Sequence, residues 1–204
     1  MGKTGCFAPF WRKKMTFILI SGRTGVGKTH VCKRLRDMIE LNTTFSRLGR
    51  QPSKSGNGGD FIAHYEKSGK HIVLNSPSDS DNCMIEFCQF LDGLAKKKVR
   101  PDIIITTIRE TDVQHDQMSH MLALLDAYAN GTQSLAAHYT SVIMAKPIHT
   151  PFAPNALSHH AFVLHLEQQP VSGSKEEQEK ALALYWDDNA DKLKYALDFA
   201  IARL

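Results

Sequence analysis

The stretch FILISGRTGVGKT, residues 17–29, is the strongest indication of the fold. Its four leading apolar residues, 17–20, predict a short strand that is buried on both faces. The glycines that follow predict a tight loop, and residues 29–41 then carry apolar side chains at the spacing of one helix face. The sequence therefore predicts a strand, a glycine-rich loop and a helix in immediate succession.

Within this stretch, residues 22–29 match the pattern GxxxxGK[ST] at every fixed position. Glycines let successive backbone N–H groups point into one concavity, and the helix that follows presents its positive end to the same place. Lys28 is expected to reach the β- and γ-phosphates of a nucleotide, and the Thr29 hydroxyl to ligate Mg²⁺. A glycine-rich turn without a ligand is the alternative, which the flanking strand and helix disfavour. The residues expected to surround the nucleotide are Gly22, Arg23, Thr24, Gly25, Val26, Gly27, Lys28, Thr29 and His30.

Outward from this stretch, short apolar runs alternate with helical periodicity. Further strands are expected at residues 72–74, 103–105, 142–145 and 162–164. Helices are expected at residues 82–97, at residues 113–128 and in the C-terminal segment, where Trp186, Leu193, Leu197 and Ala200 share a face. Unbroken apolar runs indicate strands covered on both sides, so the predicted fold is a doubly wound α/β fold, with a mostly parallel sheet flanked by helices. Residues 51–60 (QPSKSGNGGD) are expected to form a mobile loop.

The chain has 204 residues, a formal net charge of +4 and 42% hydrophobic residues, which fits one globular domain. Residues 1–14 mix glycine, proline and a basic cluster without periodicity, so a flexible basic arm is expected ahead of a single domain at residues 15–204. The four cysteines indicate neither a disulfide framework nor a zinc site. No apolar run is long enough to span a bilayer, and a cytoplasmic location is expected.

The octet GRTGVGKT, residues 22–29, resembles the deviant phosphate loop GKGGVGKT of the ParA/MinD group of P-loop ATPases. Arg23 falls on that family's signature lysine, which reaches the nucleotide of the partner subunit in the ATP-bound dimer. Residues 75–78 (NSPS) resemble the family's Asp-Thr-Pro-Pro turn, and residues 103–112, 142–147 and 162–167 resemble its later strands. The resemblance implies the P-loop NTPase fold, ATP and Mg²⁺ as cofactors, a nucleotide-dependent homodimer, a protein partner, and catalytic roles for Lys28 and Arg23.

Several positions depart from the family pattern. Asn75 stands where the family has a carboxylate that holds the Mg²⁺ shell, and an amide supplies an oxygen without a charge. No aspartate lies at residues 48–50, near which the family carries the acid that positions the attacking water. Asp60 and Asp79 could substitute if their loops fold inward, although a solvated turn position is favoured for each. The expected metal ligands are Thr29, Asn75 and Asp79, and we expect nucleotide binding with slow or absent hydrolysis.

Two active functions stay open on this reading. One is a ParA/MinD-like switch, an ATPase with slow turnover that serves plasmid partition, mobilisation or other cargo positioning. The other is a small-molecule kinase or an ATP-dependent ligase, because residues 24–27 also resemble dethiobiotin synthetase. Against the second stands the lack of an arginine-rich lid, since Arg109 is the only arginine between Arg100 and Arg203. A scaffold that keeps the loop only as structure is a third alternative.

Three other groups of residues attract attention. Lys96, Lys97, Lys98 and Arg100 could contact nucleic-acid phosphates, although a solvated helix end is the favoured interpretation. Arg109 and Glu110 follow an expected strand at the ligand-binding edge of an open sheet, and are candidates for switch or partner contacts. The histidines 149, 159, 160 and 165 lack the spacing of a metal site, and a surface cluster is favoured.

Overall fold

The computed structural model describes residues 15–77, 80–109, 117–144, 160–167 and 172–204. In chain order its elements are β1 (Thr16–Gly22), α1 (Lys28–Leu41), β2 (Ser46–Pro52), β3 (Phe61–Lys67), β4 (Lys70–Asn75), α2 (Asp81–Lys96), β5 (Ile103–Arg109), α3 (Gln117–Ala129), α4 (Leu135–His138), the π-helical turn η1 (Tyr139–Ile143), β6 (His160–His165) and α5 (Lys175–Arg203). The strands expected at residues 17–20, 72–74, 103–105 and 162–164 are confirmed as β1, β4, β5 and β6.

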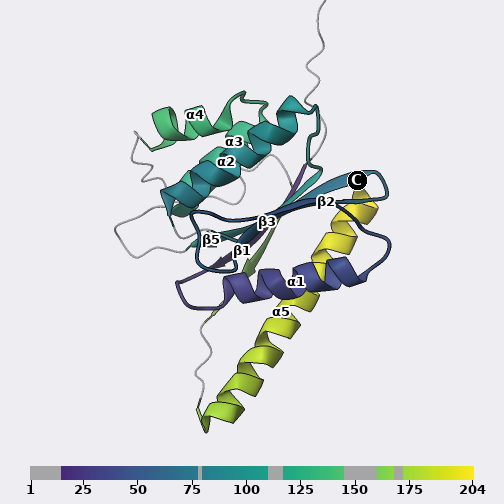
Figure 1. Cartoon of the computed structure of the whole chain (residues 1–204), viewed down its shortest axis with the longest axis vertical. Coiled ribbons are helices and arrows are strands. Elements are labelled where there is room, and N and C mark those ends of the chain that lie inside the picture. Colours follow the sequence, from purple (N-terminus) through teal and green to yellow (C-terminus); the bar gives the residue numbers. More distant parts are fainter. Residues whose placement is uncertain (1–14, 78–79, 110–116, 145–159, 168–171) are drawn as a thin grey trace, which may run out of the picture.

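Six strands form one sheet in the order β2-β3-β4-β5-β1-β6 (Figure 1). The strands β4, β5, β1 and β6 run parallel, while β3 is antiparallel to β4 and β2 is antiparallel to β3. The expected mostly parallel sheet is therefore confirmed. In its register Gly22 lies beside Arg109, and Asn75 lies beside Thr106, so the carboxyl ends of three neighbouring strands meet at one edge.

Helices cover both faces of the sheet (Figure 1). The helices α2, α3 and α4 lie on one face, and α1 and α5 lie on the other. Within β1, Phe17 and Leu19 pack into the first of these cores, while Ile18 and Ile20 pack into the second. This alternation explains why β1 has an unbroken apolar run, because each of its faces meets a core.

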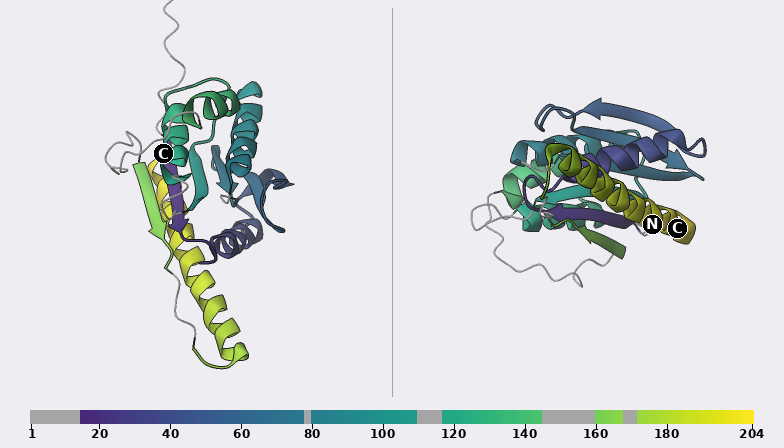
Figure 2. Two further views of the ribbon diagram at one scale, coloured as in Figure 1. Left: turned by 90° about the vertical axis from the view of Figure 1, so that its left-hand side faces the viewer. Right: turned by 90° about the horizontal axis from the view of Figure 1, so that it is seen from below.

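The edges of the sheet differ in character. Figure 2 shows β6 at one edge beside β1, and the hairpin of β2 and β3 at the other.

The first turns of α5 extend away from the body of the domain (Figure 1), where Ser174 and Glu177 form a capping box. Further along α5, Leu193, Leu197 and Ala200 are buried, which confirms the apolar face expected there.

The hairpin of β2 and β3 is missing from the sequence prediction. Strand β2 is exposed or half-exposed along its whole length, so it needs no apolar run, and it carries Gly49 and Pro52. Strand β3 is buried, but its apolar side chains are interrupted by His64. Neither strand therefore shows the signal by which the parallel strands are recognised. Residues 51 and 52, expected in the glycine-rich loop, belong to β2.

The strand expected at residues 142–145 is wrong, because residues 139–143 form a helical turn that continues α4. Tyr139 and Ile143, four residues apart, are buried, while Val142 is 39% exposed. The hydroxyls of Thr140 and Ser141 donate to carbonyl oxygens one turn earlier. A short apolar run fits either element, and here the spacing of the buried residues is helical.

The remaining expected helices are confirmed within a few residues, and some of the candidate residues lie outside the described part of the chain. The helices expected at residues 29–41 and 82–97 are α1 and α2. The helix expected at residues 113–128 is described from Gln117, as α3. The arm at residues 1–14, Asp79, Glu110, His149 and His159 lie outside the described residues.

Candidate nucleotide site

The candidate site surrounds the loop that joins β1 to α1. Gly25 and Gly27 have φ angles of +83° and +91°, which residues with a side chain rarely adopt. A Cβ atom on Gly27 would lie 2.3 Å from Nε1 of Trp186, on α5. Backbone conformation and close packing therefore both require glycine at residue 27.

Lys28, the first residue of α1, folds back over this loop. Its Nζ donates hydrogen bonds of 2.8 Å to the carbonyl oxygens of Gly22 and Arg23. The residue is buried, with 7% of its surface exposed. Its ammonium group therefore lies beside the positive end of α1, and both charges favour an anion at this place.

A cavity of about 350 Å³ opens at the loop and the first turns of α1. It is lined by Thr24, Gly25, Gly27, Lys28, Thr29, His30, Lys33, Asn57 and Gly58. Six of these residues belong to the motif region that the sequence predicts as the nucleotide site, and the structure brings them together. Of the other predicted residues, Val26 is buried, whereas Arg23 is exposed.

Thr29 is joined to Asp60, which lies at the end of the glycine-rich loop. The Thr29 hydroxyl donates a hydrogen bond of 2.9 Å to Asp60 Oδ1, which also accepts one of 3.2 Å from the Ser76 hydroxyl. Asp60 is only 2% exposed, so the expectation of a solvated turn residue is wrong for it. The alternative, in which the loop folds inward and presents this carboxylate to the site, is the one that the structure shows.

Ser76, rather than Asn75, reaches Asp60. Asn75 is buried, and its Nδ2 donates to the Pro77 carbonyl oxygen at 3.1 Å and to Thr106 Oγ1 at 2.9 Å. Its Oδ1 has no hydrogen-bond partner in the part of the chain that is described. Successive strand residues point to opposite faces, so Asn75 and Ser76 cannot both turn toward α1.

The oxygen atoms around Asp60 suit a hard cation. A carboxylate and the hydroxyls of Thr29 and Ser76 are the donors that Mg²⁺ prefers, and Mg²⁺ is commonly bound through one or two carboxylates together with phosphates and water. Among the described residues Asp60 has no ion-pair partner, and a buried carboxylate without one is stabilised by a nearby cation. These three residues could therefore hold Mg²⁺.

Glu86, on α2, holds the loop at residues 53–60 in place. Its carboxylate accepts hydrogen bonds from Ser53 Oγ at 2.8 Å, from the Lys54 amide at 3.1 Å and from the Ser55 amide at 3.2 Å. Burial alone would raise the pKa of Glu86, but these hydrogen bonds outweigh it and lower the pKa. The glycine-rich loop is therefore hydrogen-bonded to α2 through Glu86.

An aromatic pair that the sequence does not predict flanks the cavity. The rings of His30 and Trp186 are stacked, with centroids 4.0 Å apart and planes 7° apart. Burial, and then the positive charges of Lys33 and Arg34, lower the pKa of His30. Trp186 is expected to share a helix face with Leu193, and both belong to the core on this side of the sheet, but the Trp186 ring also lies against Gly27 of the phosphate loop.

The remaining candidates are dispersed. Arg109 lies at the end of β5 beside Gly22, and Arg23 at the surface. His165 Nδ1 lies 3.2 Å from the Ser21 hydroxyl, and His160 lies five residues earlier, in the same strand. The described residues contain no group of three or more histidine, cysteine, aspartate or glutamate side chains that could hold a metal ion.

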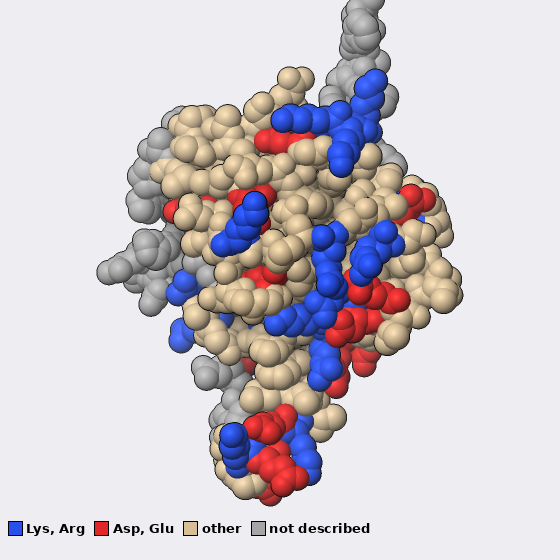
Figure 3. Space-filling model, in the orientation of Figure 1, with Lys and Arg blue, Asp and Glu red and all other residues tan. Residues whose placement is uncertain are grey.

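On the face seen in Figure 3, basic side chains lie in several groups with acidic side chains beside them. Arg100 is partly buried, and its Nη2 donates to the Ala129 carbonyl oxygen at 3.1 Å, so this guanidinium group has a structural contact. The lysines at residues 96–98 are exposed. In Figure 3 blue and red side chains alternate over the visible face, including the projecting end of α5, where Lys180 pairs with Glu176.

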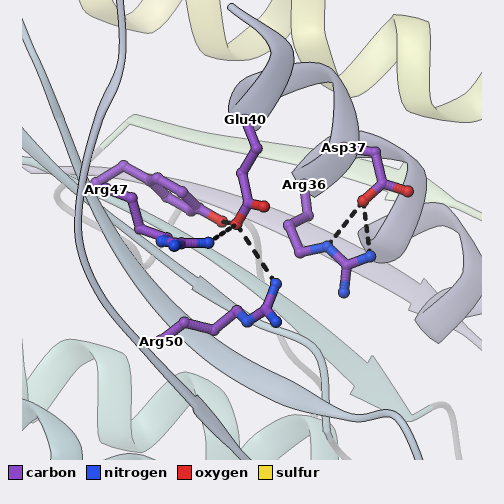
Figure 4. Close-up of polar contacts among 6 residues, drawn as sticks. Arg36, Asp37, Glu40, Arg47 and Arg50 are labelled. Carbon is purple, nitrogen blue, oxygen red and sulfur yellow. Dashed lines mark hydrogen bonds and ion pairs between the residues drawn. The ribbon is translucent and has the colours of Figure 1, made fainter.

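Two arginines lie close to Glu40, on α1 (Figure 4). Arg47 and Arg50 of β2 approach its Oε1 at 3.4 and 3.6 Å, and the Tyr65 hydroxyl donates to the same atom at 3.0 Å. Burial, and then the charge of Glu40, raise the pKa of Tyr65. The cluster connects the exposed strand β2 to α1, and its carboxylate offsets part of the positive charge.

Comparisons with known protein families, with curated proteins and with solved structures find no match to this chain. None of the helices in the described segments is both long enough and apolar enough to cross a membrane. The geometry of the site and the sequence of the phosphate loop are therefore the basis for any statement about function.

Proposed function

We propose that this chain binds a Mg²⁺–nucleoside triphosphate, with ATP the expected nucleotide, and acts as a ParA/MinD-like switch of the P-loop NTPase class with weak hydrolysis. One observation carries the proposal: the Thr29 hydroxyl and the buried Asp60 carboxylate are hydrogen-bonded at 2.9 Å beside a cavity that Lys28 and the glycine loop line. A hydroxyl next to the loop lysine, backed by a buried carboxylate, is the arrangement that a metal–triphosphate requires.

Each residue has a distinct task in this scheme. Lys28 would transfer its hydrogen bonds from the Gly22 and Arg23 carbonyl oxygens to the β- and γ-phosphates. Thr29, Asp60 and Ser76 would hold the metal ion, whose charge offsets that of the phosphates. The backbone amides of the loop and the start of α1 would bind the remaining phosphate oxygens.

Slow turnover follows from how Asp60 is used. Its Oδ1 accepts from Thr29 and Ser76, and its Oδ2 accepts from the Asn57 amide at 2.9 Å. A carboxylate that holds the metal ion together with Thr29 and Ser76 is not available to orient an attacking water, so the bound nucleotide would be hydrolysed slowly. The bound state would then persist long enough to serve as a signal.

The switch itself would be a dimer that forms on the triphosphate. Arg23 is exposed on the phosphate loop, where its side chain can reach a second copy of the chain. The γ-phosphate would favour the closed dimer, and its loss would release the partner by a shift of populations. The cargo would be a plasmid, another nucleic acid or a protein that is positioned by this cycle, a role proposed from the resemblance of the loop.

Light scattering after size exclusion tests the switch, with ATP and Mg²⁺, with ADP and Mg²⁺, and with neither. We expect the mass to double with ATP and Mg²⁺, and to stay that of the monomer with ADP and Mg²⁺ or without nucleotide. Arg23→Ala should bind ATP but remain monomeric, and Lys28→Ala should do neither. Phosphate release should stay well below the roughly 1–100 s⁻¹ of kinases. A mass that stays unchanged at saturating ATP, or rapid intrinsic hydrolysis, would contradict the proposal.

A small-molecule kinase or ligase is the second candidate, and one observation favours it. The cavity continues past Thr29 to Lys33, Asn57 and Gly58, on the side of Asp60, where an acceptor would meet the γ-phosphate. Substrate-dependent ADP formation, without a change of mass on ATP binding, would favour this function over the switch.

A further inference from the structure

The first turns of α1 present two different faces at the cavity. Thr29 and Lys33, four residues apart, share a helix face, and that face meets Asp60 and the loop at residues 53–60. His30 and Arg34, also four residues apart, share the next face, and that face meets α5. The cavity therefore has one side next to Asp60 and an aromatic side next to Trp186, on adjacent faces of α1 about 100° apart.

The aromatic side is held rigidly. Arg34 Nε lies 3.0 Å from Asp187 Oδ1, which fixes α1 against α5 next to the stacked rings. The Tyr185 hydroxyl donates a hydrogen bond of 2.8 Å to the Glu167 carbonyl oxygen, which fixes α5 to the segment after β6. Trp186 is therefore positioned from both sides, and its ring supports one face of the His30 imidazole.

His30 is suited to stack with a further ring. The residue is exposed and lines the cavity, so its imidazole has a face that is not covered by Trp186. An aromatic pair of this kind is a stacking platform for a nucleobase, because every base has a π-face.

We propose that the purine base of the bound nucleotide stacks on the open face of the His30 imidazole, with Trp186 supporting the ring from behind. This inference rests on the proposed function, because it assumes a triphosphate in the loop. With the metal and the γ-phosphate on the Asp60 side, the α-phosphate and the nucleoside would lie toward the adjacent face of α1, which carries His30.

The same geometry sets the chemical class of the ligand. Stacking supplies affinity without hydrogen-bond readout, so adenine and guanine are bound with similar strength, and both more tightly than the smaller pyrimidines. The site therefore takes purine nucleotides as a class.

Calorimetric titration with ATP, GTP and inorganic tripolyphosphate, each with Mg²⁺, separates the base from the phosphates. The wild type is compared with His30→Ala, His30→Phe and, as a control on another element, His138→Ala. We expect His30→Ala to weaken ATP and GTP roughly 5- to 150-fold, the range for loss of a base–aromatic stack, and to change tripolyphosphate less than about twofold. His30→Phe should retain most of the affinity for ATP.

A second readout uses Trp186 itself. Since the chain has two tryptophans, Trp11→Phe leaves Trp186 as the sole one. ATP should change its fluorescence more than tripolyphosphate does. Equal losses of ATP and tripolyphosphate in His30→Ala, or no loss of either, would overturn the stacking inference and leave the proposed function standing. A wild-type chain that binds neither ligand would overturn both.

Discussion

The Thr29 hydroxyl lies 2.9 Å from Asp60 Oδ1, although 31 residues separate them in the chain. Thr29 is the second residue of α1, and Asp60 ends the glycine-rich loop before β3. Among the described residues, Asp60 has the only carboxylate that is hydrogen-bonded to Thr29, and this bond links it to the phosphate loop. The proposed metal site depends on this hydrogen bond.

Asp60→Asn should remove most of the Mg²⁺ dependence of nucleotide binding. The amide oxygen can still accept from Thr29 and Ser76, so the fold should persist, but the hydrogen bond from the Asn57 amide to Oδ2 and the charge that attracts the cation are lost. We expect the ratio of ATP affinities with Mg²⁺ and with EDTA to fall about 10- to 100-fold. Asp37→Asn, an exposed change on α1, is the matched control and should leave that ratio unchanged. An unaltered ratio in Asp60→Asn would remove Asp60 from the metal site.

Gly27→Ala should destabilise the domain more than Gly25→Ala. Both glycines have positive φ, which costs about 1–3 kcal/mol with a side chain, but only at Gly27 would the new Cβ lie 2.3 Å from Trp186. Urea unfolding should show about 1 kcal/mol or more between the two variants. Equal stabilities would mean that α5 does not press on the loop as described.

Glu86→Gln should loosen the loop at residues 53–60. The substitution removes the charge from a carboxylate that accepts bonds from Ser53, Lys54 and Ser55, and should cost about 1–3 kcal/mol. Hydrogen exchange at the Lys54 and Ser55 amides should accelerate. As a comparison, Glu176→Gln breaks an exposed ion pair with Lys180 and should cost less than about 0.5 kcal/mol. Unchanged exchange at the two amides would contradict the anchoring role.

His64 should make the domain sensitive to mild acid. It is buried, its Nε2 lies 3.1 Å from His71 Nδ1, and burial, then the charges of His71 and Lys97, lower its pKa to about 4. The unfolded chain takes up this proton near pH 6.5, so the stability is fully present above that pH and is lost as the pH falls from about 6.5 to 4. His64→Gln should flatten the dependence of the urea midpoint on pH in that window. An equally steep dependence in the variant would assign the effect to other groups.

The parallel strands and the phosphate loop could be predicted from the sequence because their signals are local. Phe17 to Ile20 form an unbroken apolar run, and the loop has a fixed spacing of glycines and lysine. Strand β2 could not be predicted in this way, since its exposed residues pair with β3 through backbone hydrogen bonds. Residues 142–143 were misjudged because helix and strand share short apolar runs.

The residues that contact the phosphate loop from distant parts of the chain could not be predicted from such local signals. Asp60 and Trp186 reach it from distant segments, and their positions depend on how the β2–β3 hairpin and α5 pack. Composition favoured a solvated Asp60, whereas its bonds to Thr29 and Ser76 compensate for its burial. The helical pattern predicts that Trp186 lies on the face of the helix that packs on the core, but it does not predict which other segment the ring contacts.

Calorimetric titration of the wild type and of Lys28→Ala with Mg²⁺–ATP measures whether the phosphate loop binds a nucleotide through its lysine. Lys28 supplies the ammonium group at the loop, and its loss leaves the rest of the cavity lining in place. We predict saturable one-to-one binding by the wild type and a loss of at least about 100-fold in Lys28→Ala, as expected for removing a charged hydrogen-bond donor from phosphate. Binding of equal strength by both proteins, or no heat of binding from either, would contradict the account.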